Sequence, residues 1–152
     1  MDSSRKKGRY SRIYKQLQEL LTKTTDPDAR MATIVAVLHH KMDYFFWTGF
    51  YFLAKGELTV RSYQGPLACQ VLAKHKGVCW AGLDQGKTII VEDVGQFPGH
   101  ITCNPASRSE IVVPVRNEKG ELCGVFDIDS TSLTSFDETD AAWLEKIVEL
   151  IF

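Results

Sequence analysis

Two strand-like segments joined by a short turn constrain the fold of this chain more than any other feature. Residues 109–116 and 121–129 are rich in β-branched and apolar residues, and the turn between them begins at Asn117 and ends at Gly120. Strand-type residues on both sides of a short turn with Asn and Gly predict a β-hairpin. Because a hairpin pairs its strands in opposite directions, we expect an antiparallel sheet.

Three helices are predicted from apolar spacing and from capping residues. Apolar residues follow the 3.6-residue helical period from Tyr10 to about Leu21, and again in a second helix after Asp26, a predicted N-cap followed by proline. A last helix is expected from Ser135, because Glu138 three residues later completes a capping box. These helices have apolar faces that need a sheet or another helix to cover them.

Further strand-like segments precede the hairpin. They cover residues 45–53, 57–63 and 87–91, and the region between the last two is a mixture of loop and short helix. A loop from residue 92 to about 108 follows, and a loop of that length in a compact domain is usually functional, so we expect it to act as a lid. The expected fold class is α+β, with a mostly antiparallel sheet of about six strands and helices layered on it.

Length and composition limit the class of protein. A chain of 152 residues with 44% hydrophobic and 24% charged residues is typical of one globular domain. The net charge of -1 gives no electrostatic case for nucleic acid, and no apolar run is long enough to span a membrane. The basic residues 1–9 are not followed by an apolar signal segment, so we interpret them as a flexible leader before a single domain at 10–152. Four cysteines without an export signal indicate reduced thiols in the cytoplasm.

The second strand of the hairpin has a face rich in carboxyl groups. Successive strand residues point to opposite faces, so Asp127 and Asp129 should share a face with Cys123, and a symmetric turn places Glu110 directly opposite Asp127. Like charges opposite each other destabilise a sheet by about 0.2–1 kcal/mol. We therefore interpret the cluster as functional: one carboxyl keeps a proton near neutral pH, and the others hold an ammonium group. The alternative is a polar, solvent-facing side of a hairpin with a slipped register.

The cysteines fall into two groups. Cys69, Cys79 and Cys103 lie in loop or loop–helix regions, where exposure and thiolate character are expected, whereas Cys123 lies inside a strand and is interpreted as a small buried hydrophobe. The absence of a Cys-x-x-Cys motif argues against a thioredoxin-type pair and a common structural zinc site, and we expect neither a metal nor another cofactor. A looser metal site with His100, Cys103 and the two aspartates stays open as an alternative, although a single loop histidine is more often a hydrogen-bonding residue.

Two aromatic residues, Trp47 and Tyr51, are four positions apart on the first predicted strand and should share a face. Core packing explains most such pairs. The functional interpretation is an apolar wall for a methyl-sulfur group, since contacts between sulfur and aromatic rings contribute about 0.3–1.5 kcal/mol.

Several segments together resemble the free methionine-(R)-sulfoxide reductases, which are single GAF-domain enzymes. The resemblance spans about residues 10–152 and includes the intervals of 10 and 24 residues between the three loop cysteines. It departs at Trp80, where the family usually has glycine. The segments that carry it are 47–51, 64–69, 77–79, 99–103, 109–112 and 127–130.

The resemblance implies a GAF-like fold and reduction of free L-methionine-(R)-sulfoxide to methionine. It implies Cys103 as the nucleophile that becomes a sulfenic acid, with Cys69 then forming a disulfide that thioredoxin reduces. Cys79 stays open as an alternative resolving residue or nucleophile. We assign Glu110 and Asp129 to protonating and holding the sulfoxide oxygen. In the same reading Asp127 helps to hold the ammonium, and Trp47 and Tyr51 enclose the methyl-sulfur end.

Two other functions are compatible with the sequence. A GAF module that senses a nucleotide or another small ligand explains the fold but leaves the cysteines without a role. A metal-binding protein that uses Asp127, Asp129, His100 and Cys103 is the third hypothesis. The resemblance also implies a homodimer, because GAF domains often pair through their terminal helices.

Overall fold

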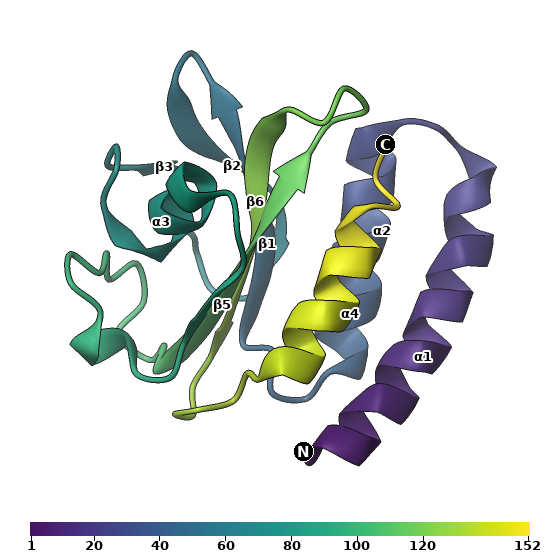
Figure 1. The fold of residues 1–152 in the computed structure, drawn as a ribbon, viewed down its shortest axis with the longest axis horizontal. Coiled ribbons are helices and arrows are strands. Elements are labelled where there is room, and N and C mark those ends of the chain that lie inside the picture. Colours follow the sequence, from purple (N-terminus) through teal and green to yellow (C-terminus); the bar gives the residue numbers. More distant parts are fainter.

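A six-stranded antiparallel sheet forms the centre of the protein, whose computed structural model describes residues 1–152 (Figure 1). The strand order is β3-β2-β1-β6-β5-β4, and each neighbouring pair is antiparallel. The predicted α+β class is therefore confirmed. The strands are β1 (Trp47–Ala54), β2 (Glu57–Gln64), β3 (Val71–Leu72), β4 (Ile89–Val91), β5 (Ser109–Arg116) and β6 (Leu122–Ser130).

Helices cover the two faces of the sheet unequally. Three long helices lie on one face and the short α3 lies on the other, next to the loops (Figure 1). Strand alternation divides the apolar residues accordingly: Phe126 and Ile128 of β6 join a core of 22 buried residues under the long helices, whereas Val125 joins a core of 12 on the α3 side. The helices are α1 (Ser3–Leu20), α2 (Pro27–Lys41), α3 (Gly77–Gln85) and α4 (Glu138–Val148), with the 3-10 turns η1 (Leu21–Lys23) and η2 (Val94–Gln96). No helix is both long and apolar enough to cross a bilayer.

The capping predictions are confirmed for α2 and corrected for α4. The Asp26 side chain accepts a hydrogen bond from the Asp28 backbone, and proline occupies the first turn of α2. Helix α4 begins three residues later than predicted from Ser135, with Asp137 as its N-cap and Asp140 completing the capping box. Ser135 does not cap the helix because its hydroxyl pairs with that of Ser130 at 2.7 Å.

The expectation that residues 1–9 form a flexible leader is wrong. Helix α1 starts at Ser3, and the Lys6 side chain is only 3% exposed. Its Nζ donates to Oδ2 of the fully buried Asp140 (2.6 Å) and to the Ser135 carbonyl oxygen (2.8 Å). The Tyr10 hydroxyl donates to the other carboxylate oxygen of Asp140 (2.7 Å). The basic residue therefore attaches the start of α1 to the start of α4.

Replacing Lys6 should destabilise the fold. Lys6→Met leaves the buried Asp140 carboxylate without its cation, and breaking a buried ion pair in this way costs about 3–5 kcal/mol of the free energy of unfolding. Urea denaturation followed by circular dichroism measures the loss. The matched control is Lys7→Met, because Lys7 is exposed on the same turn of α1. Equal stability of the two variants would show that residues 1–9 are a leader after all.

Candidate active site

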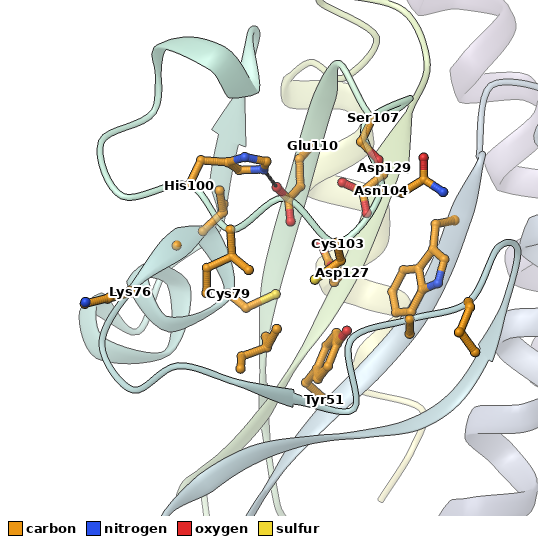
Figure 2. A pocket seen from close by; sticks show the side chains of 17 residues that line it. Tyr51, Lys76, Cys79, His100, Cys103, Asn104, Ser107, Glu110, Asp127 and Asp129 are labelled. Carbon is orange, nitrogen blue, oxygen red and sulfur yellow. Dashed lines mark ion pairs between the residues drawn. The ribbon is translucent and has the colours of Figure 1, made fainter.

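A cavity opens on the α3 side of the sheet, where β1, β5 and β6 face α3 and the loop that follows β4 (Figure 2). Of the eight residues predicted for the site, only Cys69 does not itself line this cavity, and it is covalently joined to a residue that does. The structure thus brings together side chains from five separate segments of the chain. The lining residues predicted from sequence are Trp47, Tyr51, Cys79, Cys103, Glu110, Asp127 and Asp129.

The three carboxyl groups share one face of the β5–β6 hairpin, but the pairing differs from the predicted one. Glu110 lies opposite Asp129, and Asp127 lies opposite Val112. The prediction placed Glu110 opposite Asp127. Two features near the turn cause the difference. Arg116 pairs with Leu122 rather than with Glu121, and a β-bulge shifts the register by one more residue between Arg116 and Val115. A shift of two residues in the partner preserves the shared face, so the cluster survives the correction.

The same bulge removes Cys123 from this face. Val115 pairs with Gly124 and Arg116 with Leu122, so Cys123 is the unpaired residue. It contacts the core on the helix side, is half-buried, and its Sγ donates to the Val115 carbonyl oxygen (3.5 Å). The prediction that Cys123 shares a face with the two aspartates is therefore wrong, because alternation fails across a bulge.

Burial keeps protons on the carboxyl groups. Glu110 and Asp127 are 5% and 6% exposed, and no Lys or Arg forms an ion pair with any of the three acids. Withdrawal from water, with the charge of Asp129 second, raises the pKa of Glu110 to about 8. Burial and neighbouring carboxylates also raise the pKa values of Asp127 and Asp129 well above their ordinary range. Glu110 can therefore donate a proton near neutral pH.

His100 is a basic side chain within ion-pair distance of the cluster. Its Nε2 lies 3.6 Å from Glu110 Oε2, and the pair is visible in Figure 2. Burial lowers the pKa of His100, so a neutral imidazole is favoured. The sequence indicated a hydrogen-bonding loop residue, and the structure supplies Glu110 as its neighbour.

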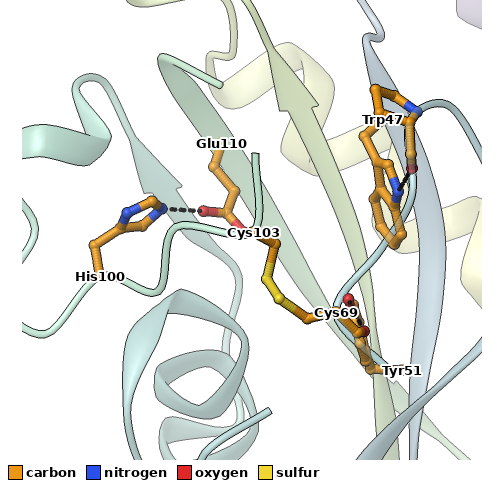
Figure 3. The surroundings of a disulfide bond; sticks show 7 residues. Trp47, Tyr51, Cys69, His100, Cys103 and Glu110 are labelled. Carbon is orange, nitrogen blue, oxygen red and sulfur yellow. Dashed lines mark hydrogen bonds and ion pairs between the residues drawn. A yellow bond between two sulfur atoms is a disulfide. The ribbon is translucent and has the colours of Figure 1, made fainter. Parts of the chain in front are cut away.

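A disulfide joins Cys69 to Cys103, which lines the cavity (Figure 3). Cys69 lies in the loop after β2, and Cys103 lies in the long loop between β4 and β5. The pairing is the one that the family resemblance implied. The two remaining cysteines, Cys79 and Cys123, are free thiols.

Cys79 differs from its predicted environment. It lies within α3 rather than in an exposed loop, and it is only 5% exposed. Burial, together with the nearby carboxylates of Asp127 and Glu110, raises the pKa of the Cys79 thiol. The expectation of thiolate character is therefore wrong for this cysteine. Trp80, the next residue, is also buried in the core on this face, with its Nε1 donating to the Leu72 carbonyl oxygen (3.4 Å).

The aromatic wall, formed by Trp47 and Tyr51, stands on β1 beside the disulfide loop. The two rings are stacked with centroids 5.8 Å apart. Trp47 Nε1 donates to the Pro66 carbonyl oxygen (3.1 Å), and the Tyr51 hydroxyl donates to the Cys69 carbonyl oxygen (2.9 Å) (Figure 3). The wall therefore also holds the backbone that carries Cys69.

Sequence reasoning did not identify several polar lining residues. Lys76, Asn104 and Ser107 border the cavity from loops and from the start of α3 (Figure 2). Such residues are common in loops, and no spacing or motif distinguishes them before the chain is folded. The loop at 92–108 does reach the cavity, as its length suggested.

Comparison with known proteins defines the class of this domain. Residues 17–151 match the family of GAF domains, so the fold class expected from the resemblance is confirmed. A crystal structure of free methionine-R-sulfoxide reductase from Neisseria meningitidis in complex with its substrate superposes with a TM-score of 0.91 at 38% identity, over 96% of this chain and 87% of that one. A free methionine-R-sulfoxide reductase of Escherichia coli is 34% identical over 139 residues, which are 91% of this chain and 84% of the relative. GAF domain-containing protein A of Dictyostelium discoideum is 42% identical over 147 residues, or 96% and 92% of the two chains.

These similarities identify the family. The chain belongs to the free methionine-R-sulfoxide reductases, a group of oxidoreductases built on a single GAF domain. The resemblance found in the sequence is therefore confirmed.

The buried carboxyl of Glu110 should make the fold less stable as pH rises. Between its ordinary pKa of 4.5 and its folded value of about 8, the folded state holds a proton that the unfolded state has lost. The free energy of unfolding then falls by up to about 1.4 kcal/mol per pH unit for this one group. Glu110→Gln should flatten the pH dependence by that amount, measured by urea denaturation at several pH values in this interval.

The matched control is Glu118→Gln, because Glu118 is exposed in the hairpin turn and stays in water in both states. A slope in Glu110→Gln equal to that of the control would mean that Glu110 carries no extra proton in the folded protein.

Proposed function

We propose that this protein reduces free L-methionine-(R)-sulfoxide to L-methionine by a cysteine sulfenic acid cycle. The observation that carries the proposal is that a buried carboxyl, that of Glu110, and one sulfur of a disulfide, that of Cys103, line the same cavity. A sulfoxide needs both groups: a thiol to attack its sulfur and an acid to protonate its oxygen. The names of the E. coli relative and of the N. meningitidis structure support the substrate.

The first step forms a sulfenic acid on Cys103. With the disulfide reduced, the Cys103 thiolate attacks the sulfoxide sulfur, and Glu110, with Asp129 opposite it, delivers a proton to the oxygen. The sulfoxide is reduced by two electrons, methionine leaves, and the oxygen ends on Cys103 as a sulfenic acid. A pKa of about 8 for Glu110 supports its function as the acid.

The second step releases water. The Cys69 thiol attacks the sulfenic sulfur, the hydroxyl leaves with a proton as water, and the Cys69–Cys103 disulfide forms. The observed link between these two residues supports Cys69 as the resolving residue and leaves Cys79 outside the cycle. A reductant with two thiols then restores both cysteines by exchange.

Selectivity for the free amino acid follows from Asp127. Its Oδ1 is buried and has no hydrogen-bond partner. An ammonium group in the cavity would supply that partner, and its positive charge would lower the pKa of Asp127 so that the carboxylate forms. A methionine sulfoxide within a peptide has no ammonium, so it would leave the acid unpaired. The aromatic wall then encloses the methyl-sulfur end of the substrate.

The proposal also includes the reductant, the cellular location and the oligomeric state of the enzyme. Thioredoxin is the proposed reductant and the cytoplasm the proposed location, because a recycled disulfide needs a reducing partner and compartment. We also infer a homodimer, paired through the terminal helices, on the resemblance to other GAF domains. The cycle requires no metal and no organic cofactor.

Turnover of the free R-sulfoxide with thioredoxin, thioredoxin reductase and NADPH tests the function. The wild type should oxidise NADPH, and Cys103→Ser should lower the rate by at least about 1,000-fold, the scale seen when a nucleophile is removed. Cys123→Ser is the matched control and should keep the wild-type rate, because Cys123 lies on the other face of the sheet. Full turnover in Cys103→Ser would overturn the proposal. A sensing module would be favoured if the protein shows no turnover and binds a ligand equally well after Cys69, Cys79 and Cys103 are replaced.

A thiol count tests the assignment of the disulfide. The reduced chain has four thiols, and one equivalent of substrate should leave the two of Cys79 and Cys123. Titration with a chromogenic disulfide in denaturant gives the count, and peptide mapping gives the link. A link between Cys79 and Cys103 would make Cys79 the resolving residue. Retention of four thiols during turnover would exclude the cycle.

A further inference from the structure

Cys79 is a buried thiol that the proposed cycle does not use. It is the third residue of α3 and lines the cavity, while the disulfide joins the other two site cysteines. An apolar core position would explain its burial. It does belong to the apolar core on this face. Two of its neighbours are acidic, however: Glu110 on β5 and Asp127 on β6 face it across the cavity (Figure 2).

The three side chains form a compact set of ligand atoms. The Cys79 sulfur and one carboxylate oxygen each from Glu110 and Asp127 all lie within 4.8 Å of one another, and all three residues are buried. Ligand atoms around a tetrahedral zinc ion are about 3.5 Å apart, given Zn–S and Zn–O bonds of about 2.3 and 2.1 Å. The three atoms are therefore at most about 1.3 Å farther apart than one tetrahedral ion requires.

An independent observation indicates that a cation fits here. Asp127 Oδ1 is buried without a hydrogen-bond partner, and no Lys or Arg pairs with the acids. An ammonium group would satisfy the oxygens, but it has no need of a sulfur ligand. One thiolate with two carboxylates is a donor set that suits Zn²⁺, which accepts both sulfur and oxygen.

We propose that Cys79, Glu110 and Asp127 form a binding site for one thiophilic divalent ion of the Zn²⁺ type. The site exists in the disulfide form of the protein. The fourth position is left to water or to His100, whose Nε2 lies 3.6 Å from Glu110 Oε2. Coordination displaces the protons of the thiol and the carboxyls, and the ion supplies the positive charge that the cluster lacks. The ion takes the place of an ammonium group, so it blocks the cavity.

This inference goes beyond the proposed reductase activity and does not depend on it. The site uses Glu110 and Asp127 from the same cavity, but binding of an ion requires neither a substrate nor a reductant. An experiment without turnover therefore separates the two proposals. The disulfide form is the form to use, because Cys69 and Cys103 then offer no thiolate to the metal.

Cobalt provides the spectroscopic probe. Co²⁺ titrated into the disulfide form should give a thiolate-to-cobalt charge-transfer band in the near ultraviolet that saturates at one equivalent, and Zn²⁺ should remove it by competition. Cys79→Ser should abolish the band and weaken Zn²⁺ binding by more than about 100-fold, since even an outer-shell change costs about 10–100-fold. Cys123→Ser is the matched control and should keep both the band and the affinity. Asp127→Asn, which keeps the thiol, should retain cobalt absorption only at much higher metal concentration.

Thermal melting of each variant without metal shows whether it is folded. The absence of a charge-transfer band in the folded wild type would overturn the proposal. So would a band that survives in Cys79→Ser, or one that disappears in Cys123→Ser. A wild type that binds Zn²⁺ but shows no turnover would keep this site and reject the reductase; the reverse result would do the opposite.

Discussion

The pairing of β5 with β6 forces three carboxyl groups together without a counter-charge, and the properties of the cavity follow from that constraint. Asp140 shows what the same chain does with a buried carboxylate that serves the fold: Lys6 and the Tyr10 hydroxyl occupy its oxygens at 2.6 and 2.7 Å. Asp127 is buried to a similar extent and its Oδ1 has no partner. A buried carboxyl without a partner keeps its proton, or it ionises when a cation binds beside it. Both outcomes are chemically useful, and neither stabilises the domain. The contrast between Asp140 and Asp127 therefore separates a buried acid whose partners join two helices from a buried acid with an unpartnered oxygen.

One face of the sheet carries the large apolar core, and the other face carries the buried carboxyl groups. On β6, Phe126 and Ile128 are completely buried under the long helices, and the residues that alternate with them are Asp127 and Asp129. Each apolar side chain of this kind contributes about 1.5–3 kcal/mol through burial. The helix side of the strand thus offsets the electrostatic cost on the other side. The bulge lies at Cys123, before these residues, so it leaves their alternation between the two faces intact.

Much of this arrangement could be predicted from the sequence, and the failures have identifiable physical causes. The hairpin, the shared face of the acids and the Cys69–Cys103 link follow from turn residues, strand alternation and family spacing. The register was wrong because nothing local marks a turn that pairs Arg116 with Leu122, or Cys123 as the extra residue of a bulge. The leader was wrong because Lys6, in a run of basic residues, has no sequence signal for a buried partner 134 positions away. Long-range pairs of polar residues are invisible to periodicity, which registers only apolar spacing.

Under the proposed function, the aromatic wall would couple substrate binding to the recycling of the thiols. Trp47 and Tyr51 each donate a hydrogen bond to a backbone carbonyl oxygen of the loop that carries Cys69, at 3.1 and 2.9 Å. The loop approaches the wall so closely that a Cβ at Gly65, where φ is +119°, would lie 2.7 Å from the Phe46 carbonyl oxygen. Under the proposed cycle, the rings that would enclose the methyl-sulfur group therefore also fix the position from which Cys69 attacks. A displacement of either ring on substrate binding would move that backbone with it. Under the proposed cycle, Tyr51 of the binding surface and the resolving Cys69 would therefore move together, although they are separated by 18 residues in the chain.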